Sequence, residues 1–230
     1  MIGRRKMTGK RRNAPPSFGP ATVLVSALLI LLQPACDSSS PTQPRPPSTR
    51  EACLADASFG AAASSPYCLP FAAGSGYPVS QSYCSPSGSH HTRFPYDFDM
   101  PMGTEILASR AGEVVELREH YLDSDTQGGH ENVVILRHSD ESLGLYIHMR
   151  HQSVLVELGD YVPRGGLLGY SGQSGSFHPH LHFQICLRAG LCSTGTTEIT
   201  LPVNFRNADG PLDSRGGLIT GETYTARVCG

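Results

Sequence analysis

The chain has 230 residues and a formal charge of −2. The six charges before Cys36 are all positive, so the remainder has 12 arginines against 20 acidic residues and a formal charge of −8. Binding to nucleic acid needs a basic face that neutralises phosphates, so we expect no nucleic-acid partner, and the same acidity argues against electrostatic adhesion to anionic polymers or lipids.

The first 35 residues predict an export signal. A basic segment precedes 12 apolar residues, 21–32, which are too few to span a bilayer comfortably and suit a signal peptide. Ala35-Cys36 resembles a bacterial lipoprotein cleavage site, although Gln33 stands where an aliphatic residue is usual. We therefore expect a membrane lipoprotein of the bacterial envelope, anchored through lipid on Cys36 and facing the periplasm or the exterior. The alternative is an ordinary secretory signal cut near Ala35, and both interpretations predict export.

The seven cysteines agree with an exported chain. Assigning Cys36 to lipid leaves six, an even set that predicts disulfides, and none are spaced as Cys-x-x-Cys metal ligands. The expected pairs are Cys186–Cys192, Cys53–Cys68 and Cys84–Cys229.

The segments after the signal differ in composition. Residues 36–50 are rich in Ser and Pro, which predicts a disordered tether. Residues 51–84 have three cysteines but little periodicity, so we expect an irregular, disulfide-linked lead-in. Residues 85–230 are expected to form one domain of about 145 residues, an ordinary single-domain size.

That domain has the pattern of β-strands. Short apolar runs with β-branched residues recur between Gly, Pro and Asp, and no window predicts a long amphipathic helix. The runs are 112–117, 132–137, 145–149, 154–156, 167–170 and 181–186. The pattern predicts an all-β fold, with an antiparallel sheet or a β-sandwich-like arrangement.

The most informative stretch is Pro179-His-Leu-His-Phe183. Side chains alternate faces along a strand, so His180 and His182 point one way while Leu181 and Phe183 anchor the other face in a core. Two imidazoles held rigidly on one face suit a metal site, although a lone His-x-His is more often a solvated strand face.

Further candidate ligands lie upstream. A catalytic zinc takes three protein ligands from His and carboxylate side chains and keeps one position open. Asp97 and one of the adjacent His90 and His91 would complete a set with His182. His91 lies an even number of residues from Asp97, which favours it if the segment is extended; a turn would remove that preference. By the same parity Asp99 competes with Asp97.

Several ordered motifs resemble one known family. Asp97 precedes a Pro-x-Gly-Thr turn at 101–104, Tyr-Ile-His-Met stands at 146–149, and Pro-His-Leu-His-Phe is intact at 179–183. Further matches lie at 108–114, 132–135 and 159–172. Together, over residues 88–186, they resemble the lysostaphin-type zinc metalloendopeptidases, which cut peptide cross-links in bacterial cell walls.

The resemblance implies a groove with one Zn²⁺ per chain, and peptidoglycan stem or cross-bridge peptides as substrates hydrolysed by zinc-activated water. The zinc ligands it implies are Asp97, His182 and either His90 or His91. The catalytic histidines it implies are His148 and His180, which would carry protons between water and the leaving amine. One departure is the spacing: the family's first histidine has three residues between it and the aspartate, and here that position is Arg93.

Two other functions stay open. A non-catalytic domain of the same fold would act as an envelope scaffold or as an activator of another wall hydrolase. A zinc-dependent binding module, or a peptidase of other substrates such as Gly-rich proteins, is also compatible, because loops around the groove set specificity. The remaining histidines are expected to be local or solvated, and these are His120, His130, His138, His151 and His178. The acidic loop 123–129 is expected to border the cleft.

Overall fold

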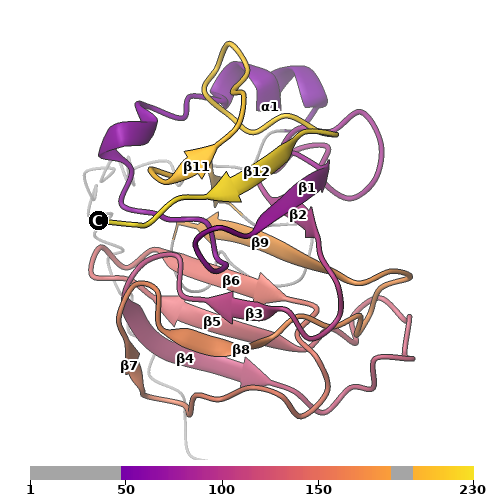
Figure 1. Cartoon of the computed structure of the whole chain (residues 1–230). Helices are drawn as coiled ribbons and strands as arrows, with labels where there is room; N and C mark the ends of the chain where they lie inside the picture. The colour runs from indigo at the N-terminus through magenta and orange to yellow at the C-terminus, as the bar shows by residue number, and fades with distance from the viewer. Residues whose placement is uncertain (1–47, 188–198) are drawn as a thin grey trace, which may run out of the picture. The chain divides into compact units, whose positions relative to one another are not determined.

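The computed structural model describes residues 48–187 and 199–230, which form an antiparallel β structure (Figure 1). The α-helix in these ranges is α1 (Arg50–Asp56), and a 3₁₀ turn follows at Ala62–Ser64. None of the helical segments described is long and apolar enough to cross a membrane. The expected signal peptide and Cys36 lie outside the described residues.

Most strands belong to one sheet. They are β1 (Gly76–Gln81), β2 (Tyr96–Asp99), β4 (Gly112–Arg118), β5 (Val133–Arg137), β6 (Leu143–Ile147), β7 (Tyr161–Val162), β9 (His180–Cys186), β10 (Thr200–Leu201), β11 (Ala208–Asp209) and β12 (Thr223–Ala226). Within the described ranges their order is β11-β12-β1-β2-β9-β6-β5-β4-β7, with β10 paired to β9. Each pair is antiparallel, so the expected all-β antiparallel fold is confirmed.

A two-stranded ribbon covers part of this sheet. It pairs β3 (Glu105–Leu107) with β8 (Leu167–Tyr170). Ile106 of β3 and Leu168 of β8 are fully buried and belong to the same hydrophobic cluster as Leu181 and Phe183 of β9. The ribbon therefore shares one hydrophobic core with the sheet, and in the view of Figure 1 it lies over β4 and β5.

The expected strands are largely present, with two differences. The run at 154–156 is not a strand, although Leu155 N donates to Leu168 O of β8 at 2.9 Å. The run at 145–149 forms a strand that ends at Ile147, since His148 adopts a φ of 65°. That left-handed backbone ends the strand, so the His148 side chain does not follow the alternation of faces along β6.

The lead-in at 51–84 is more ordered than expected. It contains α1 and β1, and β1 pairs with both β2 and β12. Sequence periodicity missed β1 because Gly76 and Pro78 are weak strand formers. The expected pairings Cys53–Cys68 and Cys84–Cys229 are wrong.

The disulfides instead join Cys53 to Cys84 and Cys68 to Cys229. The second pair follows from how the chain end returns to the lead-in. The Asn207 side chain accepts from Leu69 N at 2.8 Å and donates to Arg227 O at 2.9 Å, so Cys68 and Cys229 meet beside it. Cys186 is disulfide-bonded, and its expected partner Cys192 lies outside the described residues.

Candidate metal centre

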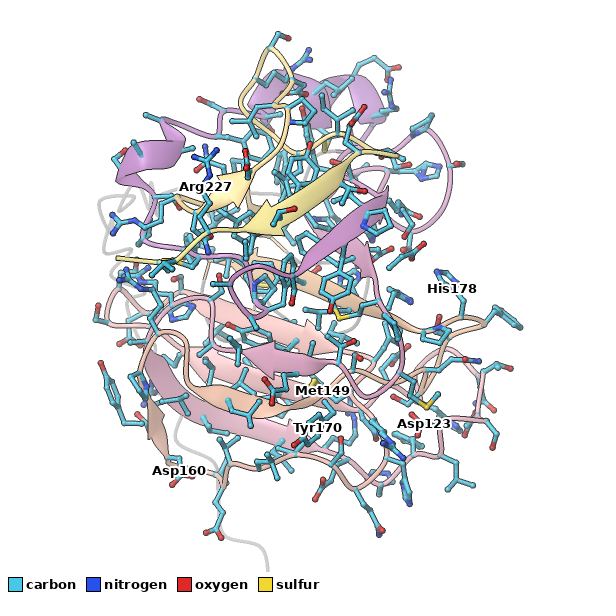
Figure 2. The ribbon with its side chains drawn as sticks, viewed as in Figure 1. Asp123, Met149, Asp160, Tyr170, His178 and Arg227 are labelled. Carbon is cyan, nitrogen blue, oxygen red and sulfur yellow. A yellow bond between two sulfur atoms is a disulfide. The ribbon has the colours of Figure 1, made fainter. Side chains whose placement is uncertain are left out.

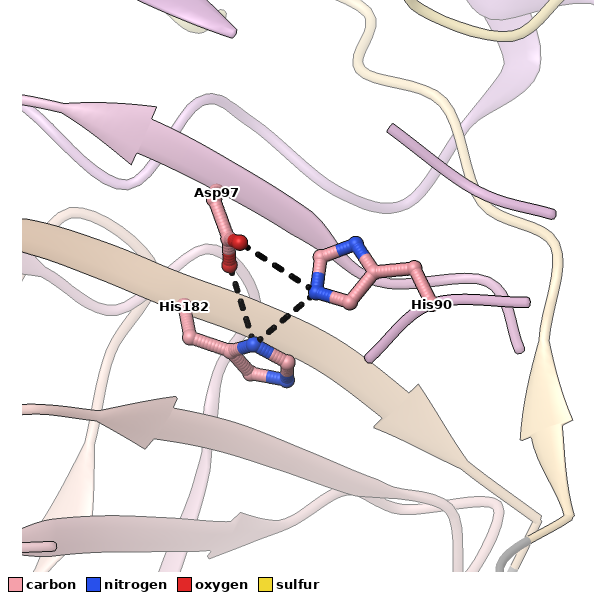
Figure 3. Close-up of side chains that lie close together, drawn as sticks. All are labelled: His90, Asp97 and His182. Atoms are coloured by element: carbon pink, nitrogen blue, oxygen red, sulfur yellow. Dashed lines mark hydrogen bonds and ion pairs between the residues drawn. The ribbon is translucent and has the colours of Figure 1, made fainter. Parts of the chain in front are cut away.

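Three side chains converge where β2 and β9 meet (Figure 3). Asp97 Oδ1 lies 2.9 Å from His182 Nδ1, and Asp97 Oδ2 lies 3.3 Å from His90 Nε2. The two ring nitrogens, His90 Nε2 and His182 Nδ1, are 3.3 Å apart. The three donor atoms all lie within 4.8 Å of one another, and His90 and Asp97 are buried.

Two of these donors are placed by strand pairing. Asp97 of β2 stands directly opposite His182 of β9 in the antiparallel register. Leu181 and Phe183 alternate with the histidines and are fully buried in the core. The expected face alternation of 180–183 is therefore confirmed, and backbone hydrogen bonds fix the spacing of Asp97 and His182.

His90 reaches the group from a loop, and His91 does not. The chain turns back between β1 and β2, with Cys84 at φ 44° and Ser85 N donating to His90 O at 3.2 Å. His90 is fully buried, whereas His91 is exposed. The preference for His91 assumes an extended segment, whereas the chain turns here and places His90 beside Asp97 and His182.

Asp99 is not part of the group. Its Oδ1 lies 3.4 Å from Nε2 of His178 instead. In the register it stands opposite His180, one pair further along the same face as Asp97. The structure therefore brings together His90, Asp97 and His182.

The hydrogen bonds around the group test whether it fits a cation. His90 Nδ1 lies 3.3 Å from the carbonyl oxygen of Ser82, and His182 Nε2 lies 3.1 Å from Oε1 of Gln184. Because both oxygens only accept, the outward ring nitrogens donate and the inward nitrogens are left as acceptors. Three acceptors facing one another at these distances repel unless a cation or proton lies among them. The donor set therefore fits a metal ion.

Two more imidazoles lie beside this group. The rings of His148 and His180 are 4.4 Å apart between centroids, and His180 Nε2 lies 3.7 Å from Asp97 Oδ1. His148 Nδ1 donates to Ser174 O at 2.7 Å, and His180 Nδ1 donates to His178 O at 3.0 Å. Each ring therefore presents Nε2 as its acceptor.

The pKa values of these groups reflect their burial. Burial, followed by the charges of His180 and His182, lowers the pKa of His148 to about 3. Burial also lowers the pKa of His180, more than Asp97 raises it. For Asp97, burial alone would raise the pKa, but hydrogen bonds and charge from His182 and then His90, when these rings carry a proton, hold it well below its ordinary value. At neutral pH both His148 and His180 are thus uncharged and able to accept a proton.

A groove of about 700 Å³ runs over these side chains. Its lining includes His148, His180 and His182, with Arg93 and Glu131 among the remaining residues. The expected acidic loop does border the groove, through Gly128 and Gly129.

The remaining histidines differ in exposure. His138 is buried and bonds locally, as expected, with Nδ1 2.9 Å from Ala111 O. His178 has an exposed side chain and lies on the segment before β9 (Figure 2). It is not simply solvated, since its ring stacks on His180 and lines the groove.

Sequence reasoning missed the residues that orient the histidines. Gln184 lies two residues after His182, so strand alternation alone places it on the same face, and that signal was available. Ser174 acts through its main-chain carbonyl, which leaves no signature in the sequence.

Comparison with known proteins gives a consistent family. The model of peptidase family M23 matches residues 93–192. Lipoprotein NlpD from Yersinia enterocolitica is 30% identical over 83 residues, which cover 36% of this chain and 77% of NlpD. The chain belongs to peptidase family M23. The match begins at Arg93, so His90 lies just before it.

Two larger relatives share this M23 domain. Peptidoglycan DD-endopeptidase ShyA from Vibrio cholerae is 32% identical over 119 residues, 51% of this chain and 23% of ShyA. Lysostaphin from Staphylococcus simulans is 31% identical over 125 residues, 54% of this chain and 23% of lysostaphin. The chain thus spans about a quarter of the length of each of these two relatives.

Proposed function

We propose that this M23 protein is a zinc metalloendopeptidase that hydrolyses peptide bonds in peptidoglycan stem or cross-bridge peptides. The observation that carries the proposal is the convergence of His90, Asp97 and His182, with two neutral imidazoles beside them. Those five side chains supply a metal-ligand set and a proton-transfer pair, and all of them except the buried His90 line one groove. The relative ShyA is a peptidoglycan DD-endopeptidase, which supports the choice of a wall peptide as substrate.

The proposed zinc ligands are His90 Nε2, the Asp97 carboxylate and His182 Nδ1, with one Zn²⁺ per chain. When bound, zinc supplies a Lewis acid that polarises the scissile carbonyl and makes water a nucleophile near neutral pH. Ser82 and Gln184 orient the two rings by accepting their outward N–H groups. Such orienting contacts raise the basicity of a ligand and fix its tautomer.

His148 and His180 are the proposed proton carriers. Their Nδ1 atoms are committed to the carbonyls of Ser174 and His178, so Nε2 of each faces the groove as a base. One accepts a proton from the attacking water and returns it to the leaving amine. While it holds that proton, the charged ring is also a donor for the oxyanion that develops on the scissile carbonyl.

The proposed location is the bacterial envelope, with lipid on Cys36 as the anchor. The basic and apolar segments before Cys36 support export. Lipoprotein NlpD, a relative of this chain, is consistent with such an anchor.

The test measures metal content of the full chain by elemental mass spectrometry, beside His90→Ala, His91→Ala, His180→Ala and His182→Ala. We expect about one zinc per chain in the wild type, His91→Ala and His180→Ala, and loss of zinc in the other two variants. Digestion of purified peptidoglycan, with labelling of new amine ends, should then succeed for the wild type and fail for His180→Ala.

Two results would contradict the proposal. His182→Ala protein that digests peptidoglycan at the wild-type rate would refute the metal assignment. Wild-type protein that takes up no zinc after reconstitution would favour the non-catalytic scaffold or activator.

A further inference from the structure

One carboxylate in the groove has an oxygen without a partner. Glu131 lines the groove just before β5, and its Oε1 accepts from Gly129 N at 2.8 Å. Its Oε2 is buried and makes no hydrogen bond. Because an unsatisfied buried acceptor costs free energy, folding alone gives no reason for Oε2 to be there.

The basic groups near Glu131 are committed elsewhere. Arg118 donates Nε to the main-chain oxygen of Glu131 at 2.8 Å, and its Nη1 lies 3.9 Å from Glu116. His130 pairs with Asp125 at 2.7 Å. Among the residues that the structure describes, none forms an ion pair with the Glu131 carboxylate.

Glu131 lies against the loop that holds the two proposed proton carriers. A Cβ on Gly175 would come 2.8 Å from Glu131 Cγ, and Gly175 has a φ of +70°, so only glycine fits there. The preceding residue, Ser174, accepts from His148, and the following Ser176 places its hydroxyl 3.4 Å from His180 Nδ1. Glu131 therefore belongs to the groove wall next to His148 and His180, with its free oxygen buried beneath the surface.

The charge of the groove makes this carboxylate distinct. Asp97 and Glu131 are the acidic side chains among the described residues that line it. Asp97 faces His90 and His182 in the metal centre. Glu131 is therefore the carboxylate left to meet a substrate.

We propose that Glu131 is a specificity-determining residue whose carboxylate, with Oε2 turned out of its buried position into the groove, binds a protonated primary amine of the substrate peptide. This inference rests on the proposed peptidase function and adds the chemical class recognised beside the metal centre. An ammonium group brings three donors and a positive charge, and its hydrogen bond to a carboxylate is about twice as strong as a neutral one. The amine is either the α-amino end of a peptide or the side-chain amine of a diamino acid, and both offer the same chemistry.

The test uses equilibrium binding of short fluorescent peptides to the full chain. One pair differs only in a free or acetylated α-amino group, and a second pair differs only in lysine or acetyl-lysine. The variant is Glu131→Gln, which keeps Oε1 as the acceptor for Gly129 N and removes the charge at Oε2. Glu113→Gln is the matched control, because Glu113 lies outside the groove and also loses one charge.

We expect acetylation to weaken binding to the wild type and to Glu113→Gln about 10-fold in at least one pair. In Glu131→Gln the same acetylation should change binding by less than about 2-fold, and the pair that responds identifies the amine. Equal discrimination by wild type and Glu131→Gln, including none in either, would overturn the inference. Whether the wild type also cleaves these peptides bears on the proposed function alone.

Discussion

Asp97 and His182 are direct cross-strand partners, with Oδ1 and Nδ1 2.9 Å apart on one face of β2 and β9. The next pair along that face is Asp99 and His180, which stand opposite each other in the same way. The ladder hydrogen bonds thus place two carboxylate–imidazole pairs in a row. His90 contacts the aspartate of the first pair, Asp97, so the metal-ligand group forms there. A site built on paired strands holds its geometry better than one built on loops.

This arrangement gives a matched comparison between two aspartates. Asp97→Asn keeps the shape of the side chain but removes the charge that faces both ring nitrogens. We expect zinc affinity to fall at least about 100-fold. Removing a ligand weakens metal binding more than removing a contact that only orients a ligand. The measurement is competition with a chromophoric chelator.

The control is Asp99→Asn on the same strand and face. Asp99 contacts His178 and none of the three proposed ligands, so its zinc affinity should equal that of the wild type. Equal losses in both variants would show that the whole face, rather than Asp97, determines metal binding.

Strand periodicity explains what the sequence alone could predict. The alternation of His180, Leu181, His182 and Phe183 requires one buried face, and that face contains the fully buried Leu181 and Phe183. Since the polar face follows from the same rule, the histidine pair was predictable without any structure. Asp97 was found by the turn motif that follows it.

Local patterns carry no such information for His90. Its position depends on how residues 82–93 turn back, which contacts distant in the sequence decide. Cys84 is bound to Cys53, and Cys84 N donates to Arg93 O at 2.9 Å. The expected pairs Cys53–Cys68 and Cys84–Cys229 are wrong for the same reason, because long-range packing sets the partners.

We therefore expect metal binding to depend on the Cys53–Cys84 disulfide. It ties α1 to the loop that presents His90, and Arg50 of α1 adds a bond from Nε to Cys84 O at 2.8 Å. In Cys53→Ser/Cys84→Ser the loop is released, and we expect zinc affinity to fall about 10-fold because His90 must be ordered on binding. Chelator competition on the oxidised proteins measures it.

The second disulfide provides the control. Each double variant should lower the free energy of unfolding by about 2–5 kcal/mol, but Cys68→Ser/Cys229→Ser should leave zinc affinity unchanged. If both double variants bind zinc equally well, the disulfide stabilises the fold and does not position His90.

Gln184 gives a prediction about a residue that only orients a ligand. It is 1% exposed and accepts the outward N–H of His182, while its amide nitrogen contacts Cys186 Sγ at 3.5 Å. Gln184→Leu leaves His182 in place but frees the tautomer of its ring. Zinc affinity should fall about 10- to 100-fold, the usual effect of losing such a contact.

The rescue variant for that prediction is Gln184→Glu, which keeps an acceptor oxygen for His182 Nε2. We expect it to recover most of the affinity lost in Gln184→Leu. A Gln184→Leu protein with wild-type affinity and a cooperative thermal transition would show that His182 needs no such partner.

The burial of His138, which lies away from the metal centre, leads to a prediction about how the free energy of unfolding depends on pH. Its ring packs between two glycines, since added Cβ atoms on Gly112 and Gly144 would come 3.1 and 2.9 Å from its nitrogens. Nδ1 donates to Ala111 O, whereas Nε2 is buried without a partner. Burial therefore lowers the pKa of His138 below its ordinary value of 6.5.

The sign follows from which state takes up the proton first. As pH falls below 6.5, the unfolded chain protonates His138 while the folded protein does not, so the free energy of unfolding decreases, by at most about 1.4 kcal/mol per pH unit for one group. His138→Asn keeps a donor for Ala111 O but cannot titrate, so its stability should fall less steeply between pH 6.5 and 5. Urea unfolding of the zinc-free proteins measures the slopes, with exposed His120→Asn as the control expected to match the wild type. Parallel slopes for the wild type and His138→Asn would mean that His138 gains its proton equally in both states.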